Sequence, residues 1–246
     1  MNKRLTLIHL RRRDFLMAGS ALAALPLLAS LPVLAQTPAD TKIGVIGSGR
    51  LGGAVGTIFA KAGYKVMFSS RHPEELKNLV AEAGPNASAG SVQDAIAFGN
   101  VILLAVPYKA LPDVGREHGA ALKGKIVLDA GNPIPTRDGE IGNEGQKNGP
   151  GETTLKYIPG VRLVRAFNSF GGRIFATEGN RAGEKIGVPL ASDDAEALKI
   201  TEKLVRDVGF EPVSVPLARG REFAPPAPLF TRALPVSQLK KELGIQ

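Results

Sequence analysis

Short apolar segments alternate with longer amphipathic ones between residues 42 and 215. The apolar runs predict buried strands at 42–46, 65–68, 101–105, 126–129 and 161–166, with further short strands near 87, at 185–190 and at 211–215. Periodic segments predict helices that end near residue 62, open at Pro73, and cover 91–98, 109–121, 194–207 and 236–243.

Strands and helices that alternate with short connections are typical of a doubly wound, mostly parallel α/β sheet. We therefore expect a Rossmann-type domain at 42–190 and a small C-terminal α/β extension of the same domain at 191–246. Residues 130–152 are rich in Gly, Asn and Pro and have no apolar period, so they predict a long functional loop.

Residues 1–35 have the composition of an export signal. The pair Arg12-Arg13, followed by Phe-Leu, precedes an Ala/Leu-rich run, and Val33 and Ala35 suit the small-residue positions before a signal-peptidase cleavage. The pair resembles the twin-arginine signal of bacteria, which exports folded proteins. A retained membrane anchor over 15–35 is the alternative, although two prolines interrupt that run.

This leader predicts a periplasmic or exported protein that uses the twin-arginine export machinery. Once the signal is cleaved, no stable membrane insertion is expected; an uncleaved signal would anchor the protein to the membrane. Residues 36–41 then form a linker to the folded part.

The charge and composition exclude several classes of partner. The formal net charge is +8, but five basic residues and one acidic residue fall in the first 35 positions and the remainder are spread along the chain. Without a concentrated basic patch, nucleic-acid binding is not expected. The chain has no Cys and only three dispersed His, so thiolate catalysis, disulfides and a metal site are not expected either.

A glycine-rich loop follows the first predicted strand and fits G-x-G-x-x-G. Gly47 permits a tight turn, Gly49 allows close approach of a pyrophosphate, and Gly52 allows the helix to pack on the strand. The start of the helix then presents free N–H groups and a positive dipole end to the phosphates. We expect the whole loop to contact a dinucleotide, namely Gly47, Ser48, Gly49, Arg50, Leu51 and Gly52.

The end of the second strand discriminates between nicotinamide cofactors. NAD enzymes usually place Asp or Glu there to accept hydrogen bonds from the ribose hydroxyls. Here Phe68 is followed by two serines and Arg71, and no carboxylate occurs before Glu74. Ser70 can donate to a 2′-phosphate and Arg71 offers a planar guanidinium for it, so the pattern predicts NADP(H).

Three later strand ends supply residues for the rest of the cofactor or for a second ligand. Ala105, Val106 and Pro107 form an apolar turn that would line the nicotinamide. Asn132 would hydrogen-bond the cofactor or the acceptor, as would Asn168, although capping of a strand end remains the alternative for both side chains.

No catalytic side chain is predicted. The sequence has no Ser–His–Asp arrangement and no carboxylate pair, and Asp129 is interpreted as a structural carboxylate. Hydride transfer can proceed by positioning alone, because the chemistry belongs to the cofactors.

The sequence resembles the NADP oxidoreductases that use the deazaflavin coenzyme F420, together with related predicted dinucleotide-binding enzymes. The resemblance depends on the following stretches in this order: Ile43-Gly44-Val45-Ile46 with the glycine loop, Ser69-Ser70-Arg71, Leu104-Ala105-Val106-Pro107, Asp129-Ala130-Gly131-Asn132-Pro133, Val164-Arg165-Ala166-Phe167-Asn168 and Val208-Gly209-Phe210-Glu211-Pro212.

This resemblance implies hydride transfer between NADP(H) and a small-molecule redox acceptor with a flat ring, with a deazaflavin or flavin as candidate co-substrate, in a protein that is often a homodimer. It carries the phosphate contacts over to Gly47–Gly52, the 2′-phosphate contacts to Ser70 and Arg71, and the nicotinamide lining to Val106 and Pro107. Two other functions stay open: an imine or β-hydroxyacid reductase, and an exported NADP-binding or redox-sensing module without turnover.

Overall fold

The computed structural model describes residues 41–245. The expected signal peptide at 1–35 and nearly all of the expected linker at 36–41 lie outside the described residues. The strands of the described part are β1 (Lys42–Ile46), β2 (Lys65–Ser69), β3 (Ala87–Gly90), β4 (Val101–Leu104), β5 (Ile126–Asp129), β6 (Arg162–Arg165), β7 (Gly187–Ala191) and β8 (Glu211–Val215).

The α-helices of this part are α1 (Arg50–Lys61), α2 (Lys77–Ala83), α3 (Val92–Phe98), α4 (Leu111–Leu122), α5 (Pro135–Asn148), α6 (Pro150–Tyr157), α7 (Gly172–Glu178), α8 (Ala195–Asp207) and α9 (Val236–Glu242). Short 3₁₀ segments occur at Pro73–Leu76, Tyr108–Ala110 and Leu217–Phe223.

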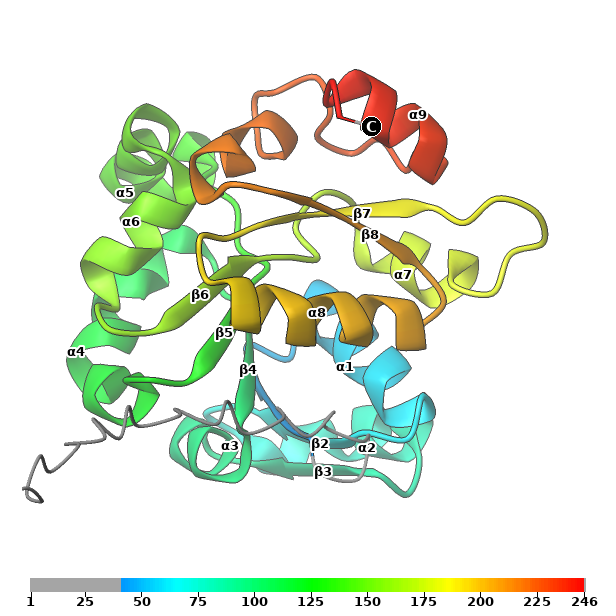
Figure 1. The fold of residues 1–246 in the computed structure, drawn as a ribbon. Helices are drawn as coiled ribbons and strands as arrows, with labels where there is room; N and C mark the ends of the chain where they lie inside the picture. Colours follow the sequence, from blue (N-terminus) through cyan, green and yellow to red (C-terminus); the bar gives the residue numbers. More distant parts are fainter. Residues whose placement is uncertain (1–40, 246) are drawn as a thin grey trace, which may run out of the picture. The chain divides into compact units, whose positions relative to one another are not determined.

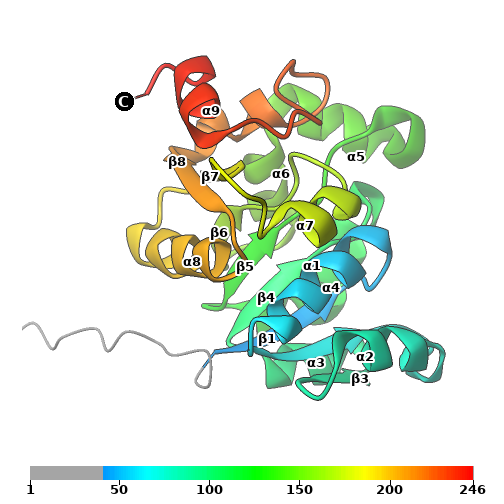
Figure 2. The ribbon, with the colours of Figure 1, turned by 90° about the vertical axis from the view of Figure 1, so that its right-hand side faces the viewer.

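The described strands form one sheet in the order β3-β2-β1-β4-β5-β6-β7-β8 (Figures 1 and 2). Strands β1 to β6 are parallel, with Ile43 of β1 opposite Val66 of β2 and Val101 of β4. The chain adds β2 and β3 on one side of β1 and then β4, β5 and β6 on the other side, which is the topology of a doubly wound Rossmann sheet. The expected fold class is confirmed.

Two apolar clusters fill the two faces of the sheet. In β4, Val101 and Leu103 join the cluster beneath α1, α2, α7 and α8, whereas Ile102 and Leu104 join the cluster beneath α3, α4 and α6. This division follows from the two-residue period of a strand. A run that is apolar at every position is therefore what a strand covered on both faces requires.

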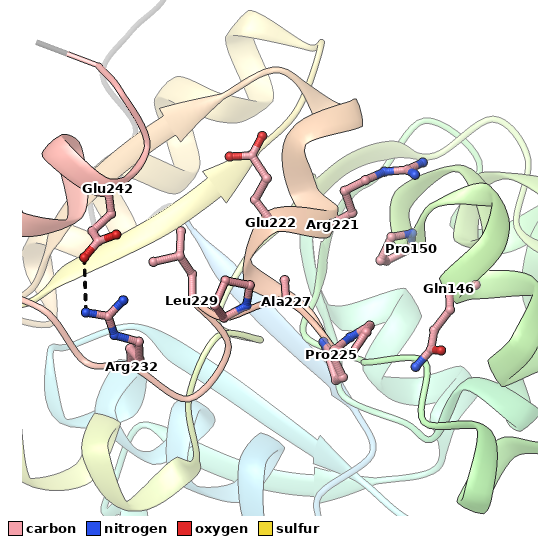
Figure 3. A pocket seen from close by; sticks show the side chains of 12 residues that line it. Gln146, Pro150, Arg221, Glu222, Pro225, Ala227, Leu229, Arg232 and Glu242 are labelled. Carbon is pink, nitrogen blue, oxygen red and sulfur yellow. Dashed lines mark hydrogen bonds and ion pairs between the residues drawn. The ribbon is translucent and has the colours of Figure 1, made fainter.

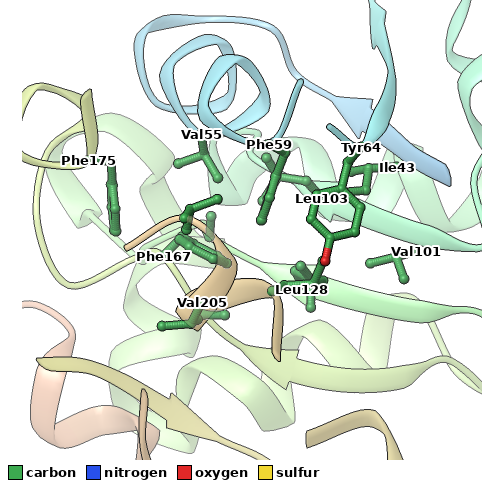
Figure 4. Packing of buried hydrophobic residues seen from close by; sticks show 14 of the residues in the cluster. Ile43, Val55, Phe59, Tyr64, Val101, Leu103, Leu128, Phe167, Phe175 and Val205 are labelled. Atoms are coloured by element: carbon green, nitrogen blue, oxygen red, sulfur yellow. The ribbon is translucent and has the colours of Figure 1, made fainter. Parts of the chain in front are cut away.

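Several aromatic rings contact one another within the first of these clusters (Figure 4). The ring centroids of Phe59 and Phe167 lie 5.4 Å apart, and those of Phe167 and Phe175 lie 5.3 Å apart. These rings join α1, the turn after β6 and α7. Burial of each such side chain contributes about 1.5–3 kcal/mol, so these contacts hold the C-terminal half of α1 against the turn after β6.

The last strands extend the same sheet. Strand β7 runs antiparallel to β6, with Arg165 opposite Ala191, and β8 pairs in parallel with β7. A third apolar cluster packs α9 against these strands, and Phe223 and Leu239 belong to it. The expected boundary at residue 190 falls within β7, so the C-terminal extension continues the sheet of the nucleotide-binding part.

The prediction of a long loop at 130–152 is wrong, because α5 and the start of α6 occupy most of it. Both helices begin with proline at a first-turn position, where its missing N–H costs no helical hydrogen bond. A Cβ atom added at Gly145 would lie 2.7 Å from the Cβ of Pro133 and 3.0 Å from the ring of Tyr108. The glycines thus permit close packing, and they remove the apolar period from which a helix is predicted.

Two other segments differ from the sequence prediction. Residues Pro73–Leu76 form a 3₁₀ turn before α2, and α7 was not predicted. Helix α7 packs closely on α1, since a Cβ atom at Gly172 would lie 2.6 Å from the carbonyl oxygen of Arg50. Among the described residues, no helix has both the length and the hydropathy needed to cross a bilayer.

Candidate functional site

The three glycines of the loop between β1 and α1 have different physical reasons for lacking a side chain. Gly47 has φ of 96°, and a Cβ atom there would lie 2.6 Å from the carbonyl oxygen of Ala105. At Gly52 a Cβ atom would lie 2.1 Å from the carbonyl oxygen of Gly47. Gly49 has an ordinary φ of −78°, and a Cβ atom there would meet no atom of the described residues within 4 Å. The fold therefore requires Gly47 and Gly52, whereas at Gly49 it leaves open space.

This open space lies at the N-terminus of α1. Gly49 is the N-cap and provides no side-chain hydrogen bond, and the first turn has no acidic residue. The first intrahelical hydrogen bond runs from the N–H of Gly53 to the carbonyl of Gly49 at 2.7 Å. The N–H groups of Arg50, Leu51 and Gly52 therefore have no acceptor from the preceding helical turn, which makes this helix start suited to an anion.

Hydrogen bonds hold the loop against the ends of two strands. The Oγ of Ser48 accepts a hydrogen bond of 3.0 Å from the N–H of Ser69, at the end of β2. Ser69 in turn donates its hydroxyl to the carbonyl of Val45 at 2.6 Å. On the other side, the N–H of Ala105 donates to the carbonyl of Ile46 at 2.8 Å. The loop is thus organised by the protein itself.

Ser70 and Arg71 follow β2 and line the same cleft as the glycine loop. The Oγ of Ser70 accepts the N–H of His72 at 3.0 Å, which leaves its hydroxyl hydrogen for another acceptor. Arg71 is exposed, and within the described part of the chain its side chain forms no hydrogen bond or ion pair. Glu74 lies 3.5 Å from His72 rather than beside Arg71. An unpaired guanidinium thus stands at the end of β2.

The cleft has a volume of about 840 Å³, which is within the range of cofactor sites. Seven of the expected cofactor-binding residues line it: Gly47, Ser48, Gly49, Ser70, Arg71, Val106 and Pro107. Five do not line it: Arg50, Leu51, Gly52, Ala105 and Asn132. Of these, Ala105 lies beneath the glycine loop, and Arg50 to Gly52 form the first turn of α1.

An apolar wall of the cleft was missed in the sequence. This wall comprises Leu76, Val92, Ala110 and Val114, and the polar side chain of His118 adjoins it one helical turn after Val114. The last three are spaced by four residues along α4 and the turn before it, so they share one helix face. That spacing was the available signal, but it also fits a helix face packed into the core.

Asn132 lies apart from the cleft, in a polar network at the ends of β5 and β6. Its Oδ1 accepts hydrogen bonds from Nδ2 of Asn168 at 3.1 Å and from Nη2 of Arg165 at 3.3 Å. Its Nδ2 donates to the carbonyl of Asn168 at 2.8 Å. The side-chain amide is therefore bonded to the protein, and a contact of Asn132 with a cofactor stays a prediction.

A buried ion pair supports this network. The Nη1 of Arg165 lies 2.8 Å from Oδ2 of Asp129, and neither side chain is exposed. Asp129 also accepts from the hydroxyl of Thr154 at 2.7 Å and from the N–H of Gly131 at 2.9 Å. Burial, the largest single effect, lowers the pKa of Arg165, but Asp129 together with Tyr108 and Glu152 outweighs it, so the pKa is raised. Asp129 is thus surrounded by donors and serves to position neighbouring groups.

Tyr108 lies beside this pair and donates its hydroxyl to the carbonyl of Pro150 at 2.8 Å. Burial raises the pKa of Tyr108 well above its ordinary value, so the phenol stays protonated at neutral pH. Three buried polar atoms nearby have no hydrogen-bond partner among residues 41–245: Nε of Arg165, Oδ1 of Asn168 and Oγ of Ser169. Hydrogen-bonding capacity therefore remains at the end of β6.

Residues 42–133 match the protein family described as NADP oxidoreductase, coenzyme F420-dependent. The metalloreductase STEAP3 of Rattus norvegicus is 27% identical over 188 residues, which cover 74% of this chain and 35% of that protein. The chain thus spans about a third of the length of this curated relative.

Solved structures share the fold over nearly their whole length. The hypothetical protein SMa0349 of Sinorhizobium meliloti matches with a TM-score of 0.67 and 25% identity, covering 79% of this chain and 95% of that one. A protein of Arthrobacter sp. FB24, provisionally described as an F420-dependent NADP-reductase, matches with a TM-score of 0.62 and 20% identity, covering 83% and 96%. The resemblance stated from the sequence is confirmed: residues 42–133 match the model of the coenzyme F420-dependent NADP oxidoreductases, a family of NAD(P)-dependent oxidoreductases.

Proposed function

We propose that this protein is an NADPH-dependent oxidoreductase that transfers hydride between NADP(H) and a flat redox acceptor, namely a deazaflavin, a flavin or a quinone-like ring. The open space at Gly49 carries the nucleotide-binding half of this proposal. No backbone strain and no neighbouring atom requires glycine there, so the missing side chain is explained by a ligand that approaches the start of α1. The uncapped N–H groups beneath it suit a pyrophosphate.

The preference for NADP(H) follows from the end of β2. Arg71 has no ion-pair partner in the described part of the chain, and Ser70 keeps a free hydroxyl hydrogen. A guanidinium binds phosphate through two parallel charge-assisted hydrogen bonds. A carboxylate at the end of β2 would instead favour the unphosphorylated ribose of NAD.

The protein's part in the reaction is binding, orientation and exclusion of water. When bound, the nicotinamide supplies the hydride chemistry. Val106 and Pro107 form the apolar edge of the cleft at the end of β4, and Gly47 fixes the turn beneath them. Asp129 and Tyr108 are held in the buried network, so we assign neither of them to proton transfer.

Calorimetry with NADPH and NADH on the ligand-free protein tests the cofactor. We expect Arg71→Ala to weaken NADPH binding roughly tenfold to a hundredfold, the value of one charge-assisted hydrogen bond of about 1.5–3 kcal/mol, and to leave NADH binding unchanged. Arg181→Ala, at an exposed arginine outside the cleft, is the matched control. Equal losses for the two nucleotides, or no heat with either, would contradict the proposal.

An exported NADP-binding or redox-sensing module without turnover is the second candidate, and the twin-arginine-type leader favours it. We propose that the protein crosses the membrane folded around its cofactor, is located in the periplasm, and remains membrane-anchored only if the signal is retained. A homodimer is proposed by family resemblance alone.

Stopped-flow absorbance separates the two functions: bound NADPH that flavins, deazaflavins and quinones all fail to oxidise would favour the binding module.

A further inference from the structure

A second cavity lies between α5, α6 and the C-terminal segment, and it has a volume of about 500 Å³ (Figure 3). Its walls are largely apolar and conformationally restricted. Pro150 opens α6 on one side, and Pro225, Pro226 and Leu229 belong to the segment opposite. Proline rings fix their own backbone φ, which restricts the conformations open to these walls. Volumes of this order accommodate small organic ligands.

The charges of this cavity leave one cation unpaired. Arg232 forms an ion pair of 3.2 Å with Glu242, and Glu222 forms one of 2.6 Å with Arg219. Arg221 also lines the cavity, but within the described residues it forms no ion pair.

Within the described residues, the Arg221 guanidinium forms one hydrogen bond, which runs from Nη2 to the carbonyl of Asn148 at 3.2 Å. Glu152 of α6 and Arg221 of the 3₁₀ segment both approach Gly149, since a Cβ atom there would lie 2.1 Å from Oε2 of Glu152 and 3.0 Å from Nη2 of Arg221. The two charges are therefore neighbours, but they form no ion pair, and Glu152 does not line the cavity. A guanidinium beside an apolar cavity is suited to a carboxylate on an apolar body.

Hydrogen bonds connect the cavity walls to the ends of β5 and β6. Gln146 lines the cavity and donates its Nε2 to the carbonyl of Pro133, at 3.3 Å. From the end of β6, Asn168 donates its Nδ2 to the carbonyl of Phe223 at 3.2 Å, and the N–H of Thr231 donates to the carbonyl of Ser169 at 2.6 Å. The cavity thus belongs to the same edge of the sheet as the nucleotide cleft, which lies at the ends of β1, β2 and β4.

We propose that this cavity is the acceptor site of the oxidoreductase, and that the acceptor is a planar aromatic or quinone-like ring with a carboxylate that Arg221 binds. The inference rests on the proposed function. Dinucleotides lie across the strand ends of such sheets, so a cofactor whose adenosine half is at β2 directs its other half toward β5 and β6. A quinone there would accept hydride, two electrons with one proton, and take its second proton from solvent to become the hydroquinone.

The first test measures binding of two redox-inactive probes, 2-naphthoate and its neutral analogue 2-naphthamide, by calorimetry on the NADP⁺-loaded protein. We expect the wild-type protein to bind the acid about tenfold more tightly than the amide. Arg221→Gln should remove this preference without changing amide binding, whereas the control Arg181→Gln should change neither. Ala227→Phe, which fills the cavity without altering its charge, should abolish binding of both probes.

The second test uses oxidation of bound NADPH by a naphthoquinone carboxylate, followed at the nicotinamide absorbance. Saturating 2-naphthoate should slow this oxidation in the wild-type protein. Equal affinity for acid and amide, a preference that survives in Arg221→Gln, or oxidation that is absent or insensitive to the probe each overturns the inference. NADPH affinity is measured for every variant, so these outcomes are distinct from a failure of nucleotide binding, which would overturn the proposed function itself.

Discussion

Gly49→Ser changes the start of α1 so that protein stability and nucleotide affinity should move in opposite directions. Gly49 is the N-cap of α1 and has φ of −78° and ψ of −162°, which serine adopts readily. Space around its Cβ position is open. Serine at an N-cap accepts a hydrogen bond from the N–H two or three residues later, which here belongs to Leu51 or Gly52. A pyrophosphate needs those same groups.

The expected magnitudes follow from this competition. Replacing a glycine cap by serine gains a few tenths of a kcal/mol in the free energy of unfolding. Loss of one charge-assisted N–H contact to the pyrophosphate costs about 1.5–3 kcal/mol of binding free energy, which is roughly a tenfold to hundredfold increase in Kd. The hydroxyl also occupies space that the phosphate would enter, which acts in the same direction.

Urea unfolding followed by circular dichroism gives the first quantity, and calorimetric titration with NADPH gives the second. Gly171→Ser is the matched control, because Gly171 is the N-cap of α7 with φ of −74° and ψ of 158° and has equally open space. We expect the control to keep wild-type NADPH affinity. A Gly49→Ser protein that is folded and binds NADPH as tightly as the wild type would refute the assignment of α1 as the pyrophosphate site.

Two predictions concern the fold. Arg165→Met should lower the free energy of unfolding by about 3–5 kcal/mol, because it leaves the buried carboxylate of Asp129 unpaired. Adding Asp129→Leu should recover most of this loss. Urea unfolding measures both variants, and an Arg165→Met protein as stable as the wild type would contradict the reasoning. A hydrogen bond from Arg162 lowers the pKa of Asp194 to about 2, so this carboxylate stabilises the fold above its unfolded pKa of about 4 and loses that effect as the pH falls toward 2. Asp194→Asn should therefore lower the free energy of unfolding by at most about 2 kcal/mol near pH 7, since the Asp194 side chain is 31% exposed and solvent screens its ion pair with Arg162. If urea unfolding curves of the wild type and the variant stay equally far apart at pH 2, the ion pair does not have this effect.

Local sequence was sufficient to predict much of the fold, and to predict the part of the candidate site formed by the glycine loop and the end of β2. The strand runs, the glycine loop and the absence of a carboxylate at Ser70 and Arg71 depend on residues close in sequence, and the periods of two and 3.6 residues report burial directly. Helix α5 was missed for a related reason. Its glycines, such as Gly145, allow close contact with neighbours such as Pro133. Because glycine has no apolar side chain, the segment lacks the apolar period from which a helix is predicted.

Tertiary structure alone decided which polar residues are free to bind a ligand. Asn132 follows a strand like a ligand-binding residue, yet Arg165, 33 positions away, and Asn168, 36 positions away, occupy its amide. Likewise, only the arrangement of the chain leaves Arg71, which the sequence singled out, and Arg221, which it did not, without ion-pair partners in the described residues. Sequence by itself determined the order of the strands, the helices other than α5, α6 and α7, and the position of the phosphate loop, because those depend on local preference. Long-range packing decided the pairing of charges, because an ion pair depends on distances that no local pattern records.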